Sequence, residues 1–107
     1  MFATNGIVYI LTNFTKTTLY IGVTSDLSAR IFQHRNNYTS SFSSKYNTHF
    51  LIYYELYHIF SEAIIREKQL KKWSRIKKEY LINIKNPTWR FLNDEIESGV
   101  YSLLENY

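Results

Sequence analysis

The segment LYIGVTSDLSARIFQH, residues 19–34, predicts a short apolar strand followed directly by a helix. The strand covers residues 19–23, and the polar triplet TSD supplies N-cap side chains for a helix that extends to about residue 35. Another strand, rich in β-branched residues, is predicted over residues 7–11. The polar connection of seven residues between the two strands favours a β-hairpin.

The rest of the chain predicts one more strand and two more helices. A polar loop is expected over residues 36–48, a strand over 50–57, a helix capped by Ser61 and Glu62 that runs to about Trp73, and a helix over 75–84. The order ββαβαα indicates an α/β (α+β) fold, with a small, mainly antiparallel sheet of three strands flanked by helices. Residues 1–93 are expected to form one domain, and residues 94–107 an acidic C-terminal tail.

Composition narrows the possible classes of protein. The chain has 107 residues, of which 45% are hydrophobic, and this is enough for one globular domain with a modest core. It has no cysteine, which excludes disulfides, thiol catalysis and zinc sites built from cysteine. The N-terminal apolar run is too short for a membrane span, and no basic start precedes it. We therefore expect a cytoplasmic protein that does not bind membranes.

Positive charge is concentrated in one part of the chain. Residues 66–90 contain nine Lys or Arg side chains and only two glutamates. A basic segment with interleaved aromatic residues favours a polyanionic partner. A solvated helix face is the alternative explanation for such a run.

The first predicted helix carries two polar residues where apolar ones are expected. Leu27, Arg30, Ile31 and His34 follow the spacing of a single helix face. Leu27 and Ile31 must lie on the buried side, so Arg30 and His34 lie on that side or at its rim. Because an unpaired buried charge is costly, Arg30 needs a partner.

The next helix repeats this pattern with a carboxylate. Glu67 lies in a stripe with Ala63, Ile64 and Leu70. One explanation is an internal salt bridge between Arg30 and Glu67, although buried pairs contribute little to stability. The other is a concave polar site in which Glu67 holds a metal ion and Arg30 faces a phosphate.

Tyr9 and Tyr20 lie eleven residues apart on the two hairpin strands. If the hairpin is centred between Phe14 and Thr15, the two tyrosines lie directly opposite each other on one face of the sheet. Aromatic cross-strand packing would account for either tyrosine alone. Gly22 is explained equally well by close backbone approach or by helix packing.

These strands resemble the GIY-YIG nuclease superfamily, which is named after two tripeptides on adjacent strands. The second tripeptide is intact as YIG at residues 20–22. The first reads IVY at residues 7–9, with Gly6 one position early, so only its tyrosine strictly matches.

The resemblance continues through the helices. Arg30 stands ten residues after the second tyrosine, where the family has an arginine, and His34 stands four residues further on. The stretch AIIREKQ, residues 63–69, resembles the family's segment with the metal-binding glutamate, here Glu67. The similarity is to the small stand-alone bacterial branch and covers about residues 6–92.

The resemblance implies a metal-dependent endonuclease that hydrolyses DNA with low sequence specificity, in a pathway such as repair or recombination. Glu67 would hold one divalent cation, Mg²⁺ or Mn²⁺. Arg30 would bind nonbridging phosphate oxygens. Tyr9, or else Tyr20, would act as the general base or position the water, and His34 would relay the proton or bind the phosphate.

The activation of the tyrosine departs from part of the family. The repair-excision branch has a lysine directly after the second tripeptide, whereas this chain has Val23. A phenol with a pKa of about 10 is a poor base at neutral pH. Nearby cations are therefore expected to lower the pKa of the tyrosine.

The partner is expected to be a nucleic acid, most readily DNA. Its backbone would be contacted by Gly22, Lys71, Lys72, Arg75, Lys77 and Lys78. A catalytically silent nucleic-acid-binding module is the alternative, but it would not need the five candidate catalytic residues together. The oligomeric state is left open by the sequence.

Overall fold

The structure is a computed structural model that describes residues 4–35 and 47–106. Its elements are β1 (Gly6–Thr12), β2 (Leu19–Thr24), α1 (Leu27–Arg35), β3 (Phe50–Tyr57), α3 (Phe60–Lys71), α4 (Arg75–Lys85), α5 (Asn93–Glu97) and the 3-10 helix η1 (Ser102–Asn106). The predicted order ββαβαα is confirmed, and α5 and η1 follow it. Most of the predicted loop at residues 36–48 lies outside the described residues. Within the described ranges, no helix has the length and apolar character needed to cross a membrane.

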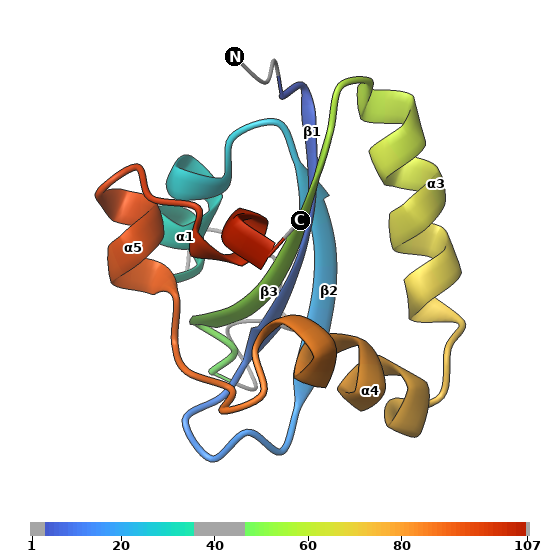
Figure 1. Ribbon diagram of the computed structural model, residues 1–107, viewed down its shortest axis with the longest axis vertical. Coiled ribbons are helices and arrows are strands. Elements are labelled where there is room, and N and C mark those ends of the chain that lie inside the picture. Colours follow the sequence, from blue (N-terminus) through green and yellow to red (C-terminus); the bar gives the residue numbers. More distant parts are fainter. Residues whose placement is uncertain (1–3, 36–46, 107) are drawn as a thin grey trace.

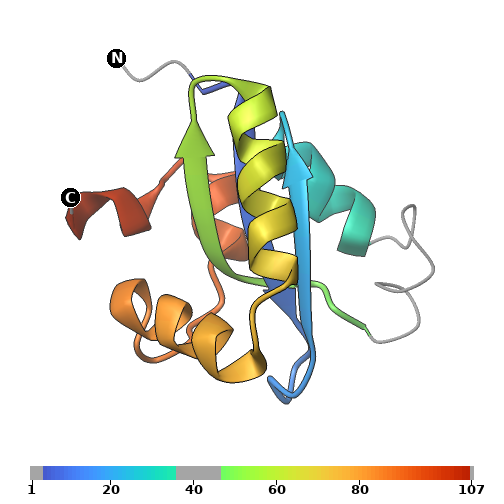
Figure 2. The same cartoon turned by 90° about the vertical axis from the view of Figure 1, so that its right-hand side faces the viewer.

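The three strands form one antiparallel sheet with β1 in the centre, in the order β2-β1-β3. Figures 1 and 2 show α3 on one face of this sheet, and α1 and α5 on the other. Every residue of β1 is buried, because the strand has a neighbour on each edge and helices cover both faces. This burial explains why residues 7–11 are apolar without alternation. The predicted antiparallel sheet flanked by helices is confirmed.

The register of the β1–β2 hairpin differs from the predicted one. Tyr9 pairs with Gly22, and Leu11 pairs with Tyr20. The two tyrosines are therefore diagonal neighbours, and the expectation that they lie directly opposite each other is wrong. Because the partner of Tyr9 is shifted by two residues, both tyrosines still point to the same face.

The side chain of Asn13 explains this register. Its carbonyl oxygen accepts hydrogen bonds from the backbone amides of Thr17 and Thr18, at 2.9 and 3.0 Å. The amide of Lys16, which has a left-handed φ of 62°, donates to the Asn13 backbone carbonyl at 3.0 Å. These bonds make residues 13–18 a compact turn centred between Thr15 and Lys16, one residue later than predicted.

The helix starts agree with the sequence at α1 and α4 but not at α3. The Asp26 carboxylate accepts from the Ala29 amide at 3.1 Å, and the Ser74 hydroxyl accepts from the Lys77 amide at 3.3 Å. The capping role predicted for Ser61 and Glu62 is wrong. The α3 helix begins at Phe60, immediately after Ile59, whose side chain makes no capping bond.

The short link between β3 and α3 accounts for this earlier start. The Ile59 carbonyl accepts from the Glu62 and Ala63 amides, so the first helical turn closes directly behind the strand. Glu62 lies inside that turn, where a negative charge interacts favourably with the helix dipole. The same helix ends at Lys71, two residues before the predicted end at Trp73.

Gly6 allows α3 to approach β1 closely. A Cβ atom at this position would lie 2.8 Å from the Ala63 Cβ and 3.0 Å from the Phe60 Cα. Side-chain Cβ atoms in proteins are almost never this close to other atoms. The missing side chain at Gly6 therefore brings the N-terminal turn of α3 against the end of the sheet.

The described part of residues 94–107, predicted as an acidic tail, packs against the sheet. Ile96 in α5 and Leu103 in η1 are buried with the strand residues. The Leu103 amide donates to the Tyr54 hydroxyl at 3.0 Å. These contacts tie the segment to β3.

We expect Asn86→Ala to lower the free energy of unfolding by about 2–3 kcal/mol, because it leaves buried backbone groups without partners. The Asn86 side-chain amide donates to the carbonyls of Ile52 and Arg90, at 2.9 and 3.0 Å. Urea unfolding of the variant and of Ser28→Ala, a change at an exposed position, measures the effect. Equal stability of the two variants would contradict this role.

Candidate active site

Tyr9 lies across the backbone of Gly22. The two residues are partners in the β1–β2 ladder, and a Cβ atom at Gly22 would lie 2.4 Å from both Cζ and Oη of Tyr9. The tyrosine ring therefore occupies the space that a side chain at position 22 would fill, and Tyr9 is only 1% exposed. Of the two explanations for Gly22, the structure supports close approach.

Tyr20 and His34 complete a cluster of three rings around Tyr9. The Tyr9–Tyr20, Tyr9–His34 and Tyr20–His34 ring centroids are 6.5, 5.9 and 5.3 Å apart. A buried hydrogen bond joins Tyr9 Oη and His34 Nε2 at 3.2 Å, and the tautomer of His34 decides which of the two atoms donates. The cluster thus brings together both strands of the hairpin and the last turns of α1.

The pKa of Tyr9 is raised, not lowered. Burial is the main cause, the charges of Tyr20 and Glu67 act in the same direction, and the charge of Arg30 opposes them. The expectation that nearby cations lower the pKa of Tyr9 is therefore wrong for the protein without metal or substrate. The positive charge of Arg30 does lower the pKa, but burial raises it by more. Tyr9 is neutral at physiological pH.

The pKa of His34 is lowered from its ordinary value of 6.5 to about 4. Burial disfavours the charged imidazole most strongly, and the positive charges of Arg30 and His49 add to this effect. His34 is therefore neutral at pH 7. A neutral phenol and a neutral imidazole share the hydrogen bond at the centre of the cluster.

Arg30 belongs to α1 and Glu67 to α3, and these helices lie on opposite faces of the sheet (Figure 1). The charges of both side chains influence the pKa of Tyr9, with opposite signs. The Glu67 side chain is 13% exposed and forms an ion pair with Lys71 at 3.2 Å. Among the described residues, no Arg30–Glu67 ion pair occurs, so the internal salt bridge considered from the sequence does not form there.

Glu67 has the chemistry of a ligand for a hard divalent cation, but it stands alone. No group of three or more His, Cys, Asp or Glu side chains suited to a metal occurs in the described parts of the chain. Mg²⁺ is commonly held by one or two carboxylates together with waters and substrate phosphates. A single, mostly buried carboxylate such as Glu67 fits that mode of binding and not a closed structural site.

A known family matches most of the chain. Residues 5–80 match the model of the GIY-YIG catalytic domain. The chain belongs to the GIY-YIG family. Membership supports a nuclease-type function and a nucleic-acid substrate, and the cluster of Tyr9, Tyr20 and His34 lies within the matched residues.

Relatives of this GIY-YIG protein are similarly small. A UPF0213 protein of Staphylococcus aureus is 34% identical over 65 residues, which cover 61% of this chain and 79% of the relative. A UPF0213 protein of Staphylococcus saprophyticus is 35% identical over 66 residues, covering 62% and 80%. The solution NMR structure of the UPF0213 protein BH0048 from Bacillus halodurans has the same fold, with a TM-score of 0.52, 24% identity and coverage of 90% of this chain and 98% of that one.

The basic residues predicted to bind substrate lie on α3, on α4 and in the link between them. Lys71, Lys72 and Lys77 are exposed, and Lys78 is half-buried. Lys77 Nζ lies 5.9 Å from the centre of the Trp73 ring. Lys71 pairs with Glu67, and none of the ring contacts described above for Tyr9, Tyr20 and His34 involves these lysines.

Arg75 serves the fold of this GIY-YIG domain. Its Nε donates to Glu79 at 2.7 Å, and its two terminal nitrogens donate to the backbone carbonyls of Thr17 and Lys16 at 2.9 and 3.1 Å. The guanidinium thus ties α4 to the hairpin turn. A phosphate would have to compete with these bonds for the same donors.

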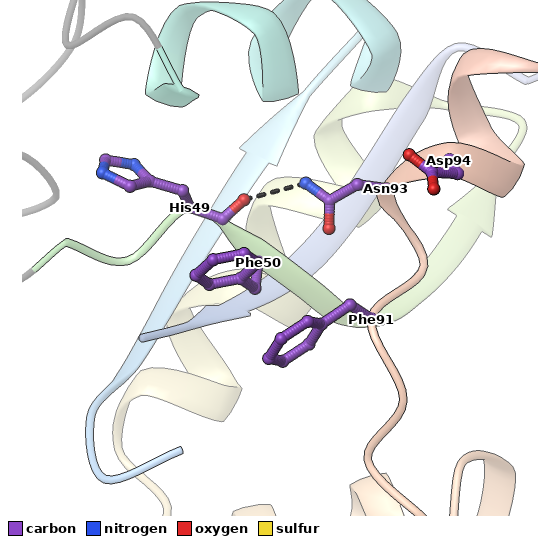
Figure 3. A pocket seen from close by; sticks show the side chains of 5 residues that line it. All are labelled: His49, Phe50, Phe91, Asn93 and Asp94. Atoms are coloured by element: carbon purple, nitrogen blue, oxygen red, sulfur yellow. Dashed lines mark hydrogen bonds between the residues drawn. The ribbon is translucent and has the colours of Figure 1, made fainter. Parts of the chain in front are cut away.

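His49, which no sequence pattern marked as functional, contributes to the lowered pKa of His34 through its charge. Its Nδ1 is buried and has no hydrogen-bond partner among the described residues. A pocket of about 260 Å³ begins beside it, lined by His49, Phe50, Phe91, Asn93 and Asp94 (Figure 3). The Phe50 and Phe91 rings stack with centroids 4.3 Å apart. Position 49 precedes the third strand, and no sequence pattern at this position could have revealed the interaction of His49 with His34.

Glu55 was also missed, although it carried a signal. It is the single carboxylate within the strand FLIYYELY, and it is 8% exposed. Burial raises its pKa, but hydrogen bonds from Arg66, Tyr53 and Tyr57 outweigh burial and leave the pKa below its usual value. An acidic residue inside an apolar strand predicts such a buried partner.

We expect Gly22→Ala to destabilise the protein by about 1–3 kcal/mol and to displace the Tyr9 ring, because the new methyl group overlaps it. Thermal unfolding of the wild type, Gly22→Ala, Tyr9→Ala and the double variant gives a double-mutant cycle. This cycle isolates the contact between position 22 and the Tyr9 ring. If the overlap is the cause, Gly22→Ala should cost much less in the Tyr9→Ala background. An equal cost in both backgrounds would place the strain elsewhere.

Acidification should destabilise the protein through His34. Its pKa in the folded state is about 4 and lies below the ordinary 6.5, so between these values the unfolded chain binds a proton that the folded protein does not. This contribution is complete above pH 6.5 and falls as the pH drops towards 4, by at most about 3 kcal/mol.

Unfolding measured from pH 7.5 to 4 tests this expectation. His34→Gln should flatten the loss of stability with falling pH, whereas substitution of the exposed His58 by Gln should leave it unchanged. Identical profiles for wild type and His34→Gln would exclude His34 as the source.

Proposed function

We propose that this GIY-YIG protein is a metal-dependent endonuclease that hydrolyses phosphodiester bonds in DNA with low sequence specificity. The observation that carries the proposal is the buried hydrogen bond between Tyr9 and His34, which is 3.2 Å long. The charges of Arg30 and Glu67 influence the pKa values of the groups in this bond. Arg30 affects the pKa of both partners, and Glu67 affects that of Tyr9. Phosphodiester hydrolysis needs these functions: a proton acceptor for water, and positive charge at the phosphate.

Because both rings are neutral, Tyr9 can relay a proton from water to His34. The phenol can accept the proton of the attacking water while its own proton passes to His34 Nε2. The negative phosphate that binds near Arg30 would offset the positive charge that lowers the pKa of His34. The proton acceptor would thus become stronger once substrate is bound.

Arg30 and Glu67 would act on the phosphate itself. The planar guanidinium can donate to two nonbridging oxygens at once. Glu67 would hold one Mg²⁺ or Mn²⁺ ion, which would neutralise the phosphate and stabilise the leaving oxygen when bound. Lys71 forms an ion pair with Glu67 and would have to give way to the metal ion.

The remaining lysines would supply attraction that does not depend on sequence. Lys72 and Lys77 are exposed, and contacts of this kind are made to the DNA backbone. Weak selectivity, a cytoplasmic location and a part in DNA repair or recombination belong to this proposal. The alternative is a silent nucleic-acid-binding module, which would bind DNA but not cleave it.

Labelled single-stranded, duplex and branched oligonucleotides, incubated with the protein in Mg²⁺, Mn²⁺ or EDTA, test the function. We expect cleavage with either metal and none in EDTA, and Glu67→Ala should abolish it. Because the ion pair that Glu67 forms within the described ranges is with an exposed lysine, the variant should lose no more than about 1 kcal/mol of stability in metal-free buffer.

Glu62→Ala is the matched control, since Glu62 is an exposed carboxylate on the same helix. Its cleavage should equal that of the wild type. DNA binding by the wild type without cleavage of any oligonucleotide would favour the silent module.

Arg30→Lys should inactivate the protein nearly as fully as Arg30→Ala, because lysine keeps the charge but loses the two-pronged fit to phosphate. The loss of an oriented donor costs about 10²- to 10³-fold in rate. Binding of uncleaved DNA should change much less. Single-turnover rates, with dissociation constants in Ca²⁺, measure both effects.

Arg90→Lys provides the control, since Arg90 pairs with Glu95 near the C-terminus and takes no part in the proposed site. A rate for Arg30→Lys close to that of Arg90→Lys would reduce Arg30 to a general electrostatic contact.

A further inference from the structure

A partly buried ion pair joins α3 to β3 on the face of the sheet opposite Tyr9. Tyr9 pairs directly with Tyr54, so the next residue, Glu55, points to the face that α3 covers. Arg66 on α3 donates to the two Glu55 oxygens from Nε and one terminal nitrogen, at 2.9 and 3.1 Å. This two-pronged geometry fixes the orientation of both side chains.

Further contacts hold each partner in place. The Tyr53 and Tyr57 hydroxyls donate to Glu55 at 2.6 and 2.7 Å. Arg66 also donates to Gln69 at 2.7 Å, and its guanidinium carbon lies 5.1 Å from the centre of the Trp73 ring. Neither the carboxylate nor the guanidinium can rotate without breaking several of these contacts.

Stability alone is a poor explanation for this pair. Replacing a buried ion pair by apolar side chains of similar size is often neutral or stabilising, because both charges must be removed from water. Such a pair can instead supply geometric specificity, because the arrangement described here satisfies both guanidinium donors and both carboxylate oxygens at once.

The pair holds α3 one residue before Glu67. Arg66 is the residue directly before Glu67, and the N-terminal turn of the same helix rests on Gly6, where a Cβ atom would lie 2.8 Å from Ala63. The Gly6 contact sets how closely the helix approaches the sheet. The Glu55 contact at Arg66, three residues further along the helix than Ala63, restricts the rotation of the helix about its own axis.

We propose that the Glu55–Arg66 pair is a positioning device that directs the Glu67 carboxylate towards the site at Tyr9. Successive residues of a helix are about 100° apart around its axis, so a bond that fixes Arg66 also fixes the direction of Glu67. This role rests on the proposed function of Glu67 as the metal ligand. Glu55 and Arg66 touch neither substrate nor metal and act through the helix.

The double variant Glu55→Gln with Arg66→Met tests this role. The glutamine amide can accept from one tyrosine hydroxyl through its oxygen and donate to the other through its nitrogen, and methionine fills much of the space of arginine without leaving a buried charge. We expect the melting temperature without metal to stay close to that of the wild type.

Two functional readouts should change. Loss of a group that orients a metal ligand typically reduces metal affinity or activity by about 10- to 100-fold. We therefore expect the half-saturating Mn²⁺ concentration to rise and kcat to fall by about that factor, with KM for DNA little changed. The rise in melting temperature on adding Mn²⁺, which reports metal binding without catalysis, should be smaller than in the wild type.

Two further variants complete the design. Arg66→Lys keeps the charge but donates from one nitrogen, and it should give intermediate Mn²⁺ affinity and kcat; it also replaces the double variant if that one does not fold. The control Glu95→Gln with Arg90→Met removes an ion pair near the C-terminus and should leave the response to Mn²⁺ unchanged.

The outcomes separate this role from the function on which it rests. Mn²⁺ affinity and kcat equal to the wild type in the double variant, or in Arg66→Lys if the double variant is unfolded, would overturn the positioning role alone. The positioning role would also be overturned if kcat of the variant equalled that of the wild type once it was calculated per folded molecule. A wild type with neither metal-dependent cleavage nor a Mn²⁺-dependent shift would overturn the proposed function and the positioning role together.

Discussion

The absence of a side chain at Gly22 is the constraint on which the candidate site depends. It leaves room for the Tyr9 ring to lie across β2, with Oη and Cζ only 2.4 Å from where a Cβ atom would stand. From there the phenol reaches Nε2 of His34 on α1 at 3.2 Å. Any larger residue would push the ring away from the histidine, and the polar pair at the centre of the site would be lost.

The sheet divides the site between its two faces. Arg30 and His34 come from α1, whereas Glu67 comes from α3 on the opposite face (Figure 1). Charge from both helices nevertheless acts on Tyr9, so the two helices must be docked accurately against one small sheet. Gly6 and the Glu55–Arg66 pair provide this accuracy for α3, by close approach and by oriented hydrogen bonds respectively.

Local patterns predicted the parts of the site that depend on helix or strand periodicity. Arg30 and His34 were recognised as inward-facing because Leu27 and Ile31 share their stripe, and His34 is indeed 1% exposed. The limits of β3 were predicted correctly, since an apolar strand bounded by polar residues is a strong local signal. The start of α3 was missed because the chain turns immediately after β3, and no capping side chain marks that point.

The sequence by itself determined the order of the elements and the family, because these follow from residue type and spacing, and it marked Arg30, His34 and Glu67 as polar residues on otherwise apolar helix stripes. Only the tertiary structure decided the partner of Tyr9, the ion pair of Glu67 and the link between Glu55 and Arg66. It also reversed the expected shift in the pKa of Tyr9, since burial outweighs the charge of Arg30. These properties depend on the turn built by Asn13 and on the helices that cover each face, which bring together residues far apart in the chain and exclude water from them.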